Sequence, residues 1–224
     1  LAKKLSAFLF KFPFVRGIAI SGGLSKNCAD DDADLDYFVI TKTNRLWIAR
    51  TLMILYGKVR NRISKDCWLC LNYYVDEKAL RIEEQNIFTA TELITLVPVC
   101  GNDAFSRFYD NNKWAGDYFP NTAVGKKALS ASHPSRFRKA MEWLLNNRLG
   151  DAIDHYLMRL TSRRWEHKEQ QQRLNAQGNR MGLRNGRHVS KPNPVYFQQK
   201  IVSAYAQKVR EATAREDYLN RLIV

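Results

Sequence analysis

The chain has 224 residues, of which 45% are hydrophobic and 26% are charged, a composition typical of globular proteins and unlike that of disordered or collagen-like chains. No uninterrupted apolar run approaches the roughly 18 residues that a membrane-spanning helix needs, which argues against an integral membrane protein. Residues 1–14 contain no small-residue cleavage site, so we expect no signal peptide and a cytoplasmic location. The formal net charge of +14 indicates an attraction for anions.

The positive charge is concentrated in the C-terminal part of the chain. Residues 1–125 carry 16 basic and 14 acidic side chains, a net charge of +2, whereas residues 126–224 carry 20 and 8, a net charge of +12. This asymmetry predicts a second module that faces an acidic partner, such as RNA, a triphosphate or a nucleotide-like acceptor. A solvated helical surface with a basic bias is the alternative explanation.

Patterns typical of strands and of helices alternate over residues 1–100. In chain order we predict a helix over residues 2–12, strands over 14–21 and 35–41, a helix over 45–63, a strand over 68–75 and, as a further candidate, a short strand over 79–83. This order predicts an α/β (α+β) sheet domain over residues 1–100.

Helical patterns dominate residues 101–224, which we therefore predict to form a basic, mostly α-helical substrate-binding domain. Helices are predicted over residues 102–114, 133–147, 151–173 and 195–222, with Asn102 as the N-cap of the first. Residues 175–194 are rich in glycine and proline, and we predict a loop there.

Cys67 and Cys70 form a C-x-x-C pattern within the strand predicted near residue 68. Residues three apart on a strand point to opposite faces, so these two thiols could not chelate one metal ion. No second such pair accompanies them, and we expect reduced thiols rather than a zinc site.

The most informative stretch spans residues 18–41 and reads IAISGGLSKNCADDDADLDYFVIT. A predicted strand leads into a Ser-Gly-Gly turn, where the missing side chains let backbone N–H groups approach a phosphate closely. Asp34 and Asp36 then enter the next strand on one face, with Cα atoms about 6.6 Å apart. Two carboxylates so placed can bracket divalent cations in phosphoryl transfer. Asp32 and Asp34 form a second Asp-x-Asp, but only Asp34 and Asp36 are followed directly by an apolar strand.

The ordered combination of a glycine pair, a short variable segment, an Asp-x-Asp motif and an apolar strand resembles the nucleotidyltransferase superfamily typified by DNA polymerase β. The resemblance is close over residues 21–38 and covers about a third of the chain, and its phrasing looks like that of a bacterial group within the superfamily. It implies transfer of a nucleoside monophosphate from an NTP to an acceptor, with release of pyrophosphate and with Mg²⁺ or Mn²⁺ as cofactor.

The resemblance also implies roles for individual residues. Asp34 and Asp36 would be catalytic and would hold the metal ion. The predicted nucleotide-binding residues are Ser21, Gly22, Gly23, Ser25, Lys26 and Asn72, together with Lys191, a basic residue just before a predicted helix start, where anions bind readily. Three further cations after the second strand are weaker candidates for phosphate contacts: Lys42, Arg45 and Arg50.

The sequence departs from the superfamily at the third carboxylate, which is usually on a neighbouring strand. That strand here reads WLCLNYYV, and alternation places Cys70, Asn72 and Tyr74 on one face. Asn72 then stands where an acid is expected, and an amide cannot act as a general base. Asp76 and Glu77, just past the strand, are candidate substitutes. The alternative function is a catalytically inactive nucleotide- or RNA-binding module of the same fold.

Overall fold

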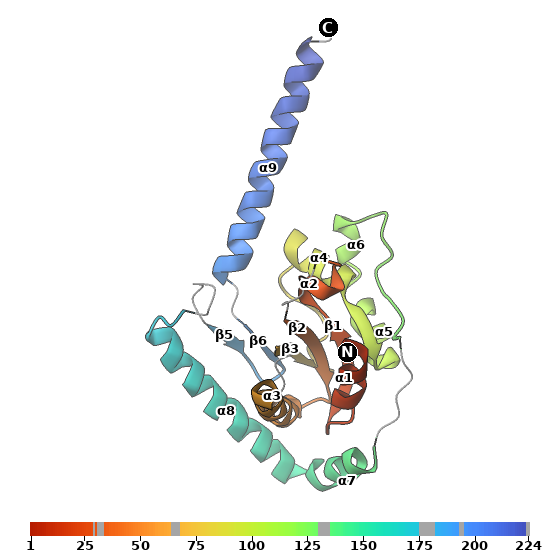
Figure 1. The fold of residues 1–224 in the computed structure, drawn as a ribbon, viewed down its shortest axis with the longest axis vertical. Helices are drawn as coiled ribbons and strands as arrows, with labels where there is room; N and C mark the ends of the chain where they lie inside the picture. Colours follow the sequence, from red (N-terminus) through yellow and green to blue (C-terminus); the bar gives the residue numbers. More distant parts are fainter. Residues whose placement is uncertain are drawn as a thin grey trace.

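The computed structural model describes residues 1–28, 30, 34–63, 68–129, 135–174, 182–192 and 195–222. A six-stranded sheet lies at the centre of this part of the chain, with the strand order β4–β1–β2–β3–β6–β5 (Figure 1). The strands are β1 (Val15–Ile20), β2 (Leu35–Thr41), β3 (Leu69–Asp76), β4 (Val97–Cys100), β5 (Leu183–Asn185) and β6 (Val189–Pro192). β2 and β3 are parallel, and the other neighbouring pairs are antiparallel. The predicted mixed α/β class is confirmed.

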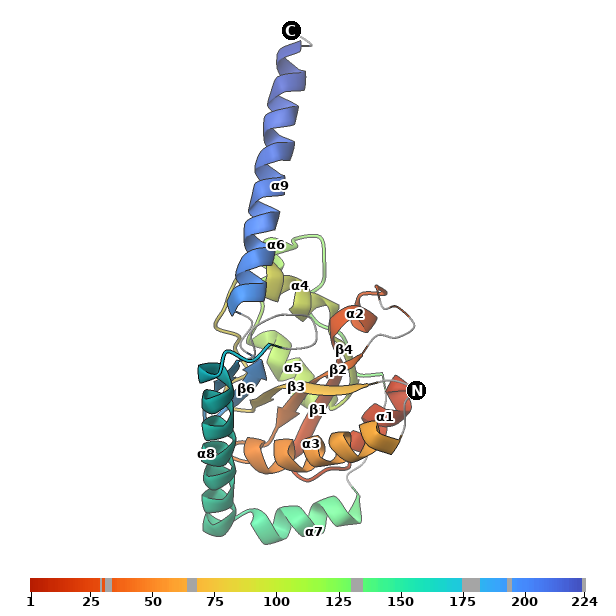
Figure 2. The same ribbon diagram turned by 60° about the vertical axis from the view of Figure 1, so that its left-hand side comes forward.

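Helices cover both faces of the sheet, as Figure 2 shows. On one face lie α1 (Ala2–Leu9) and α3 (Leu46–Ile63), with α7 (Arg136–Leu145) and α8 (Arg148–Gln170) outside them. On the other face lie α2 (Gly22–Ser25), α4 (Ile87–Thr95), α5 (Asn102–Asp110) and α6 (Ala115–Tyr118). Two separate hydrophobic clusters result, one for each face, and the central strands are therefore buried on both sides.

β2 shows why the sequence forms this sheet. Its residues are mostly β-branched or aromatic, and all except the half-buried Asp36 are buried. Tyr37 and Val39 belong to the cluster under α3, whereas Phe38 and Ile40 belong to the cluster under α5. Alternate side chains of one strand thus supply both cores, and the only charged side chain of the strand remains near its N-terminal end.

The helices α1, α3, α5, α7 and α8 confirm the corresponding predictions, with ends that differ by a few residues. The predicted N-cap of α5 is wrong by one residue, because Gly101 and not Asn102 precedes the helix. Gly101 has φ +91°, and a Cβ atom there would lie 2.0 Å from the carbonyl oxygen of Arg16. Only glycine fits this close approach of two backbones.

The strand candidate over residues 79–83 is wrong, because no strand forms there. The sheet instead gains β4, which pairs with β1 and follows α4. β4 is only four residues long and includes a proline, so its periodicity is too short to recognise without its partner strand.

The loop predicted over residues 175–194 is wrong over β5 and β6, which form a hairpin there. β6 pairs with β3 through Tyr74–Ser190 and Val75–Val189, so the sheet is not confined to residues 1–100. The two strands read LRN and VSKP, and such short polar segments carry no strand periodicity of their own. Residues 175–181 and 193–194 of the predicted loop lie outside the described residues.

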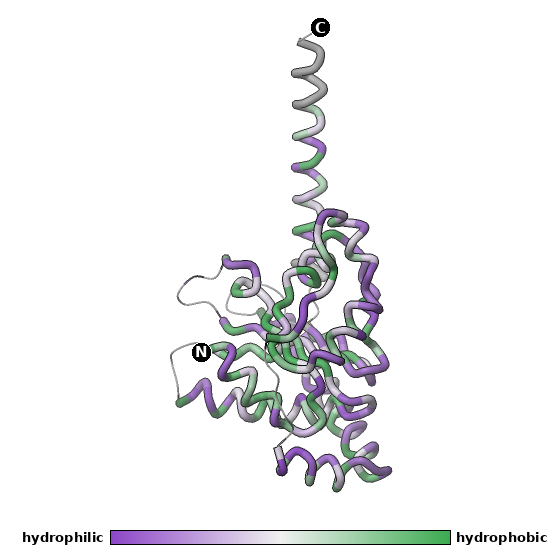
Figure 3. The backbone as a smooth tube through the Cα atoms, turned by 90° about the vertical axis from the view of Figure 1, so that its right-hand side faces the viewer, coloured by the Kyte–Doolittle hydropathy of each residue, from purple (hydrophilic) through white to green (hydrophobic). Residues whose placement is uncertain are grey.

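The last helix, α9 (Val195–Leu222), extends away from the body of the molecule (Figures 1 and 2) and has the predicted bounds. Residues 203–214 of this helix are exposed. In Figure 3 the hydrophobic colours gather at the centre of the body, whereas the projecting helix alternates between polar and apolar residues. In the described part of the chain, no helix is both long and apolar enough to cross a membrane.

Candidate functional site

The chain that leaves β1 folds back onto the start of β2. The backbone N–H of Ser21 donates to the carbonyl oxygen of Asp36 at 2.9 Å, and the short helix α2 begins at the next residue. Gly22 has φ +67°, and a Cβ atom there would lie 2.3 Å from Oδ2 of Asp36. The backbone of Gly22 therefore packs directly against the Asp36 carboxylate, and a side chain at this position would collide with it.

Both residues of the Asp-x-Asp motif lie next to Cys70. Asp34 is exposed and immediately precedes β2, and the Cys70 thiol donates to its Oδ2 at 3.7 Å. Asp36 is half-buried and is the partner of Cys70 in the parallel ladder between β2 and β3. The structure thus brings both acids to the end of the sheet where β2 and β3 begin.

The electrostatics of the site act against ionisation of Asp36. Burial, and then the negative charges of Asp34 and Glu92, raise the pKa of Asp36 to about 6, although Lys26 acts in the opposite direction. A carboxylate in this position is stabilised by any cation that reaches it. Shifted pKa values of this kind are common at functional sites, so Asp36 is a candidate for binding a cation or transferring a proton.

Lys26 and Glu92 join α2 to α4. The Lys26 ammonium lies 2.9 Å from Oε1 of Glu92 and donates to the carbonyl oxygen of Gly22 at 3.0 Å. The Ser25 hydroxyl also donates to the Gly22 carbonyl oxygen, at 2.9 Å. The predicted nucleotide ligands Ser25 and Lys26 are therefore engaged in holding the shape of α2, and Lys26 is the nearer of the two to the acidic groups.

Glu92 is a site residue that the sequence reasoning missed. It lies on α4, which begins with a capping box in which Asn86 and Thr89 exchange hydrogen bonds. This Asn-x-x-Thr signal could have identified the helix. Nothing local in the sequence, however, places position 92 beside residues 26 and 36.

The alternation predicted for β3 is wrong, because a β-bulge interrupts it. Tyr37 pairs with Leu71 and Phe38 pairs with Tyr73, so Asn72 has no partner of its own on β2. Tyr74 packs in the cluster under α3, on the opposite face from Phe38. Tyr73, rather than Tyr74, therefore lies with Cys70 on the face of Asp36. The side chain of Asn72 lies outside the described ones, so its predicted role is not tested.

A cavity of about 210 Å³ opens beside the acidic groups. Its polar lining includes Ser21, Glu92 and Lys191, and Tyr73 forms part of its wall. The rest is largely apolar and is contributed by β2, α4 and α5: Phe38, Phe88, Leu93, Leu96 and Phe108. An apolar chamber next to a few polar groups is the usual form of a small-molecule site.

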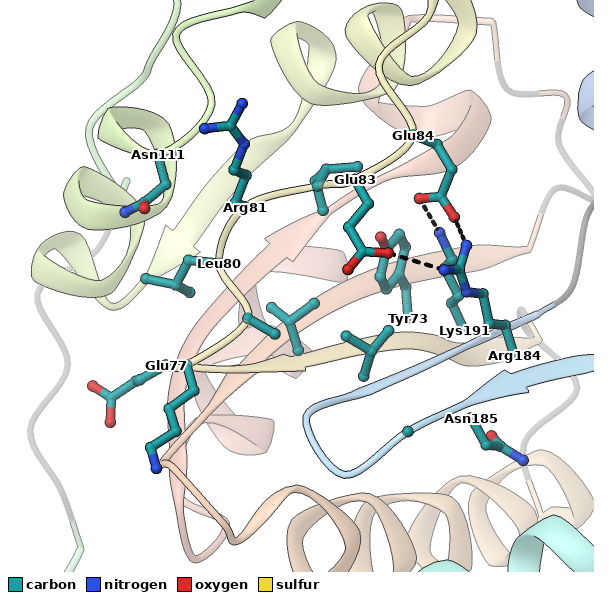
Figure 4. A pocket seen from close by; sticks show the side chains of 16 residues that line it. Tyr73, Glu77, Leu80, Arg81, Glu83, Glu84, Asn111, Arg184, Asn185 and Lys191 are labelled. Atoms are coloured by element: carbon teal, nitrogen blue, oxygen red, sulfur yellow. Dashed lines mark hydrogen bonds and ion pairs between the residues drawn. The ribbon is translucent and has the colours of Figure 1, made fainter.

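Lys191 is buried between this cavity and a larger cleft of about 510 Å³, shown in Figure 4. Its ammonium lies 2.6 Å from Glu84 and 5.5 Å from the centre of the Tyr73 ring. Burial alone would raise the pKa of Glu84, but the hydrogen bond and charge of Lys191, with Arg184, hold that pKa below its usual value. The predicted anion ligand Lys191 is thus already paired with an acid.

The structure does not bring the other candidate residues to Asp36. Asp76 is fully buried at the opposite end of β3, where it accepts a hydrogen bond from Asn44 N–H and contacts His188. Glu77 pairs with Arg107 at 2.5 Å. The prediction that Asp76 or Glu77 replaces the third carboxylate is wrong. The motif lies beside the first residues of β3, whereas Asp76 and Glu77 lie at its far end.

The three cations proposed for phosphate contacts are also placed elsewhere. Lys42 donates to Asn146. Arg45 donates to three carbonyl oxygens, two of which lie at the junction of α7 and α8, and to Asp151. Arg50 belongs to α3 and lies over the rings of Trp47 and Tyr74. All three residues lie on the side of the sheet that α3 covers, which is opposite to the side of Asp36.

Asp30 is exposed, and Asp31, Asp32 and Cys67 lie outside the described residues. Among the residues with described positions, no group of three His, Cys, Asp or Glu side chains is arranged to hold a metal ion. Two carboxylates nevertheless fit Mg²⁺, which commonly takes one or two protein carboxylates and completes its shell with phosphate oxygens and water. The donor set of Asp34 and Asp36 suits a metal ion that binds together with a triphosphate.

Comparisons of the chain with models of protein families, with curated proteins and with solved structures give no match.

Proposed function

We propose that the protein transfers a nucleoside monophosphate from an NTP to an acceptor nucleophile in a reaction that depends on Mg²⁺ or Mn²⁺. The single observation that carries the proposal is the contact between the Gly22 backbone and the Asp36 carboxylate, whose pKa is raised to about 6 beside Asp34. This contact joins the glycine pair to the Asp-x-Asp motif, the two parts on which the resemblance to nucleotidyltransferases depends.

The triphosphate is proposed to bind to the backbone of α2. Gly22 and Gly23 carry no side chains, so phosphate oxygens can approach the N–H groups of this first turn. Lys26, on the same helix, would add a positive charge. The apolar cavity between Phe38, Phe88 and Phe108 would take the base, since stacking and burial favour a flat aromatic group there.

Asp34 and Asp36 would hold the divalent cation between the protein and the triphosphate. When bound, the cation supplies positive charge that stabilises the transferring phosphoryl group. The two acids orient the phosphates relative to α2, and the cation removes the repulsion that makes ionised Asp36 unfavourable. The acceptor would enter from the exposed side of Asp34.

Glu92 is the proposed group that receives the proton of the acceptor. The described site-facing side chains of β3, Cys70 and Tyr73, offer no carboxylate, and burial raises the pKa of Tyr73 well above its usual value. Glu92 acts on Asp36 through its charge and lines the cavity, which makes it the candidate among the described acids outside the motif. Its ion pair with Lys26 keeps it oriented between α2 and α4.

The test is transfer of label from NTPs, supplied with Mg²⁺ or Mn²⁺, to a panel of hydroxyl and amine acceptors and to the protein itself. We expect Asp34→Asn and Asp36→Asn to lose at least about 100-fold in rate, the scale on which removal of one electrostatic group lowers kcat. Asp30→Asn, an exposed acid in the same loop, is the matched control and should retain activity. Equal activity in all three variants, or none in the wild type, would refute the proposal.

A second candidate function is nucleotide binding without catalysis, and the β-bulge favours it. Because Tyr73 follows Cys70 on the face of Asp36, no described acid of β3 stands beside the motif. NTP would then raise the unfolding temperature in the presence of Mg²⁺ without any transfer of label. Stabilisation by NTP together with Asp36-dependent transfer would exclude this candidate.

A further inference from the structure

A second cavity, which we call the α3–α8 pocket, lies between α3 and the C-terminal half of α8. It measures about 490 Å³, and Leu71 of β3 and Leu183 of β5 close its inner side. Figures 1 and 2 show α8 crossing beside α3 on the face of the sheet opposite to α2 and α4. The pocket is therefore separate from the site around Asp36.

The lining of the α3–α8 pocket is strongly basic. It includes five side chains that are cationic at neutral pH: Arg50, Lys58, Arg164, Lys168 and Arg173. None of the described lining residues is acidic, and none of these five cations forms an ion pair with any described carboxylate. Like charges gathered in one hollow repel one another, so the pocket is predisposed to take up an anion.

Arg50 gives the pocket its buried cation. The residue is 8% exposed, its Nε has no hydrogen-bond partner, and burial lowers the pKa of its guanidinium. It lies 5.4 Å from the centre of the Trp47 ring and 5.9 Å from that of Tyr74. The two other buried arginines in the described residues each have an acid, since Arg45 pairs with Asp151 and Arg138 with Glu142.

The missing acid at Arg50 is the observation that points to a ligand. A buried guanidinium without a counterion destabilises the fold, and it is normally retained only where a partner completes it. Contacts with two aromatic rings stabilise the cation in part, but they leave the buried Nε–H without an acceptor. The planar guanidinium offers paired N–H donors that match the oxygens of a phosphate.

We propose that the α3–α8 pocket binds a small ligand that carries two or more linked phosphates, such as a nucleoside polyphosphate or inorganic polyphosphate. Arg50 contacts one phosphate at the base of the pocket, and Arg164 and Lys168 hold the next at its mouth. The volume lies within the roughly 300–1,000 Å³ typical of small-molecule sites. Trp165 and Leu55 in the lining provide apolar surface for an organic group.

The decisive experiment is calorimetric titration with inorganic tripolyphosphate in EDTA and about 150 mM salt, where diffuse surface attraction is largely screened. The double variant Arg164→Ala/Lys168→Ala should bind at least about tenfold more weakly than the wild type, because it loses two charge-assisted contacts. The matched control is Arg159→Ala/Arg163→Ala, which removes two exposed charges with the same spacing from the same helix, outside the pocket. It should change the affinity less than about twofold.

Arg50→Met tests the buried cation separately. Methionine keeps much of the length and the apolar contacts, and removal of an unpaired buried charge should leave the unfolding temperature unchanged or raise it. The same variant should weaken tripolyphosphate binding by about tenfold or more. A purely structural Arg50 would show the opposite pattern, with lower stability and unchanged affinity, and would overturn the assignment.

Other outcomes also decide the question. Equal losses in the two double variants, or no binding by the wild type, would overturn the proposal in favour of a diffuse basic surface. Single-stranded RNA that binds through Arg164 and Lys168, without competition from tripolyphosphate, would replace the small ligand with a polynucleotide. Asp36→Asn should leave the affinity unchanged, which separates this pocket from the proposed catalytic site.

Discussion

Asp36 lies in a buried strand, where its surroundings disfavour the ionised carboxylate. Its pKa is about 6 in the folded protein, against 3.8 for the side chain in an unstructured peptide, so the folded state binds the proton more tightly. The resulting stability is fully present below about pH 4 and is lost as the pH rises to about 6. At neutral pH the ionised carboxylate therefore destabilises the fold in the absence of a cation.

Because the ionised carboxylate destabilises the fold at neutral pH, we expect Asp36→Asn to be more stable than the wild type at pH 7. The expected gain in the free energy of unfolding is roughly 2–3 kcal/mol, at about 1.4 kcal/mol for each pH unit between the two pKa values. Urea unfolding at pH 4 and pH 7 measures it, and the gain should vanish at pH 4. A gain of the same size at both pH values would show that the carboxylate does not carry the effect.

Gly22→Ala tests the backbone contact at the site. The position has φ +67°, and the new Cβ would meet Oδ2 of Asp36 at 2.3 Å. We expect a loss of about 1–3 kcal/mol in the free energy of unfolding from backbone strain and this contact. Gly186→Ala is the control, since no atom lies within 4 Å of a Cβ atom there. Equal stability of the two variants would contradict the described geometry.

At the scale of elements, Glu142 fixes α7 to the start of β1. Its carboxylate accepts hydrogen bonds from Phe14 N–H at 2.8 Å and from Arg16 and Arg138 at 2.9 and 2.8 Å. Burial opposes ionisation, but Arg16 and Arg138, with this N–H group, lower the pKa of Glu142 to about 2. The stability that this carboxylate contributes is present above about pH 4.5 and is lost as the pH falls to about 2.

Glu142→Gln should therefore lower the free energy of unfolding by about 1–2 kcal/mol at pH 7, because solvent screens part of the effect at this half-buried group, and by progressively less as the pH approaches 2. Glu166→Gln on α8 is the control, because this acid is exposed. Urea unfolding between pH 2 and pH 7 provides the comparison. If the difference between Glu142→Gln and the wild type did not shrink in acid, the ion-pair network would not be its source.

The elements also show where prediction from the sequence stops. α3 was predictable because its apolar residues recur with helical spacing, and β2 because it is a nearly continuous run of β-branched and aromatic residues. β5, β6 and the bulge at residue 72 were not, because β5 and β6 are stabilised by pairing with a strand from another part of the chain and the bulge depends on register against β2. The charge of Asp34 does act on Asp36, as expected for residues two apart, whereas their role in holding a metal ion stays a prediction.

At the scale of the whole molecule, α9 is distinct because it leaves the body. Truncation after Ser203 removes only residues that are exposed or outside the described side chains, so we expect the unfolding midpoint to change by less than about 2 °C. Truncation after Leu174 also removes the β5–β6 hairpin and takes His188 away from the fully buried Asp76, and should strongly destabilise the protein. Differential scanning calorimetry compares the two. Equal losses would mean that α9 itself stabilises the body.

Part of the positive charge of the molecule gathers in the α3–α8 pocket. The sequence places the excess in residues 126–224, but the five cations of the α3–α8 pocket come from both parts of the chain, two from α3 and three from α8 and the residues just after it. A sum over residues cannot reveal such a cluster. Its position depends on how α8 packs against α3.

The sequence by itself determined the mixed α/β class, the bounds of α9, and the neighbourhood of Asp34 and Asp36, because helix and strand periods are local properties of a few consecutive residues. Only the tertiary structure decided that β5 and β6 complete the sheet, that Glu92 and Lys26 join the acidic site, and that Arg50 is buried without an acid. These contacts join residues dozens of positions apart. They depend on packing and loop closure, which no local pattern encodes.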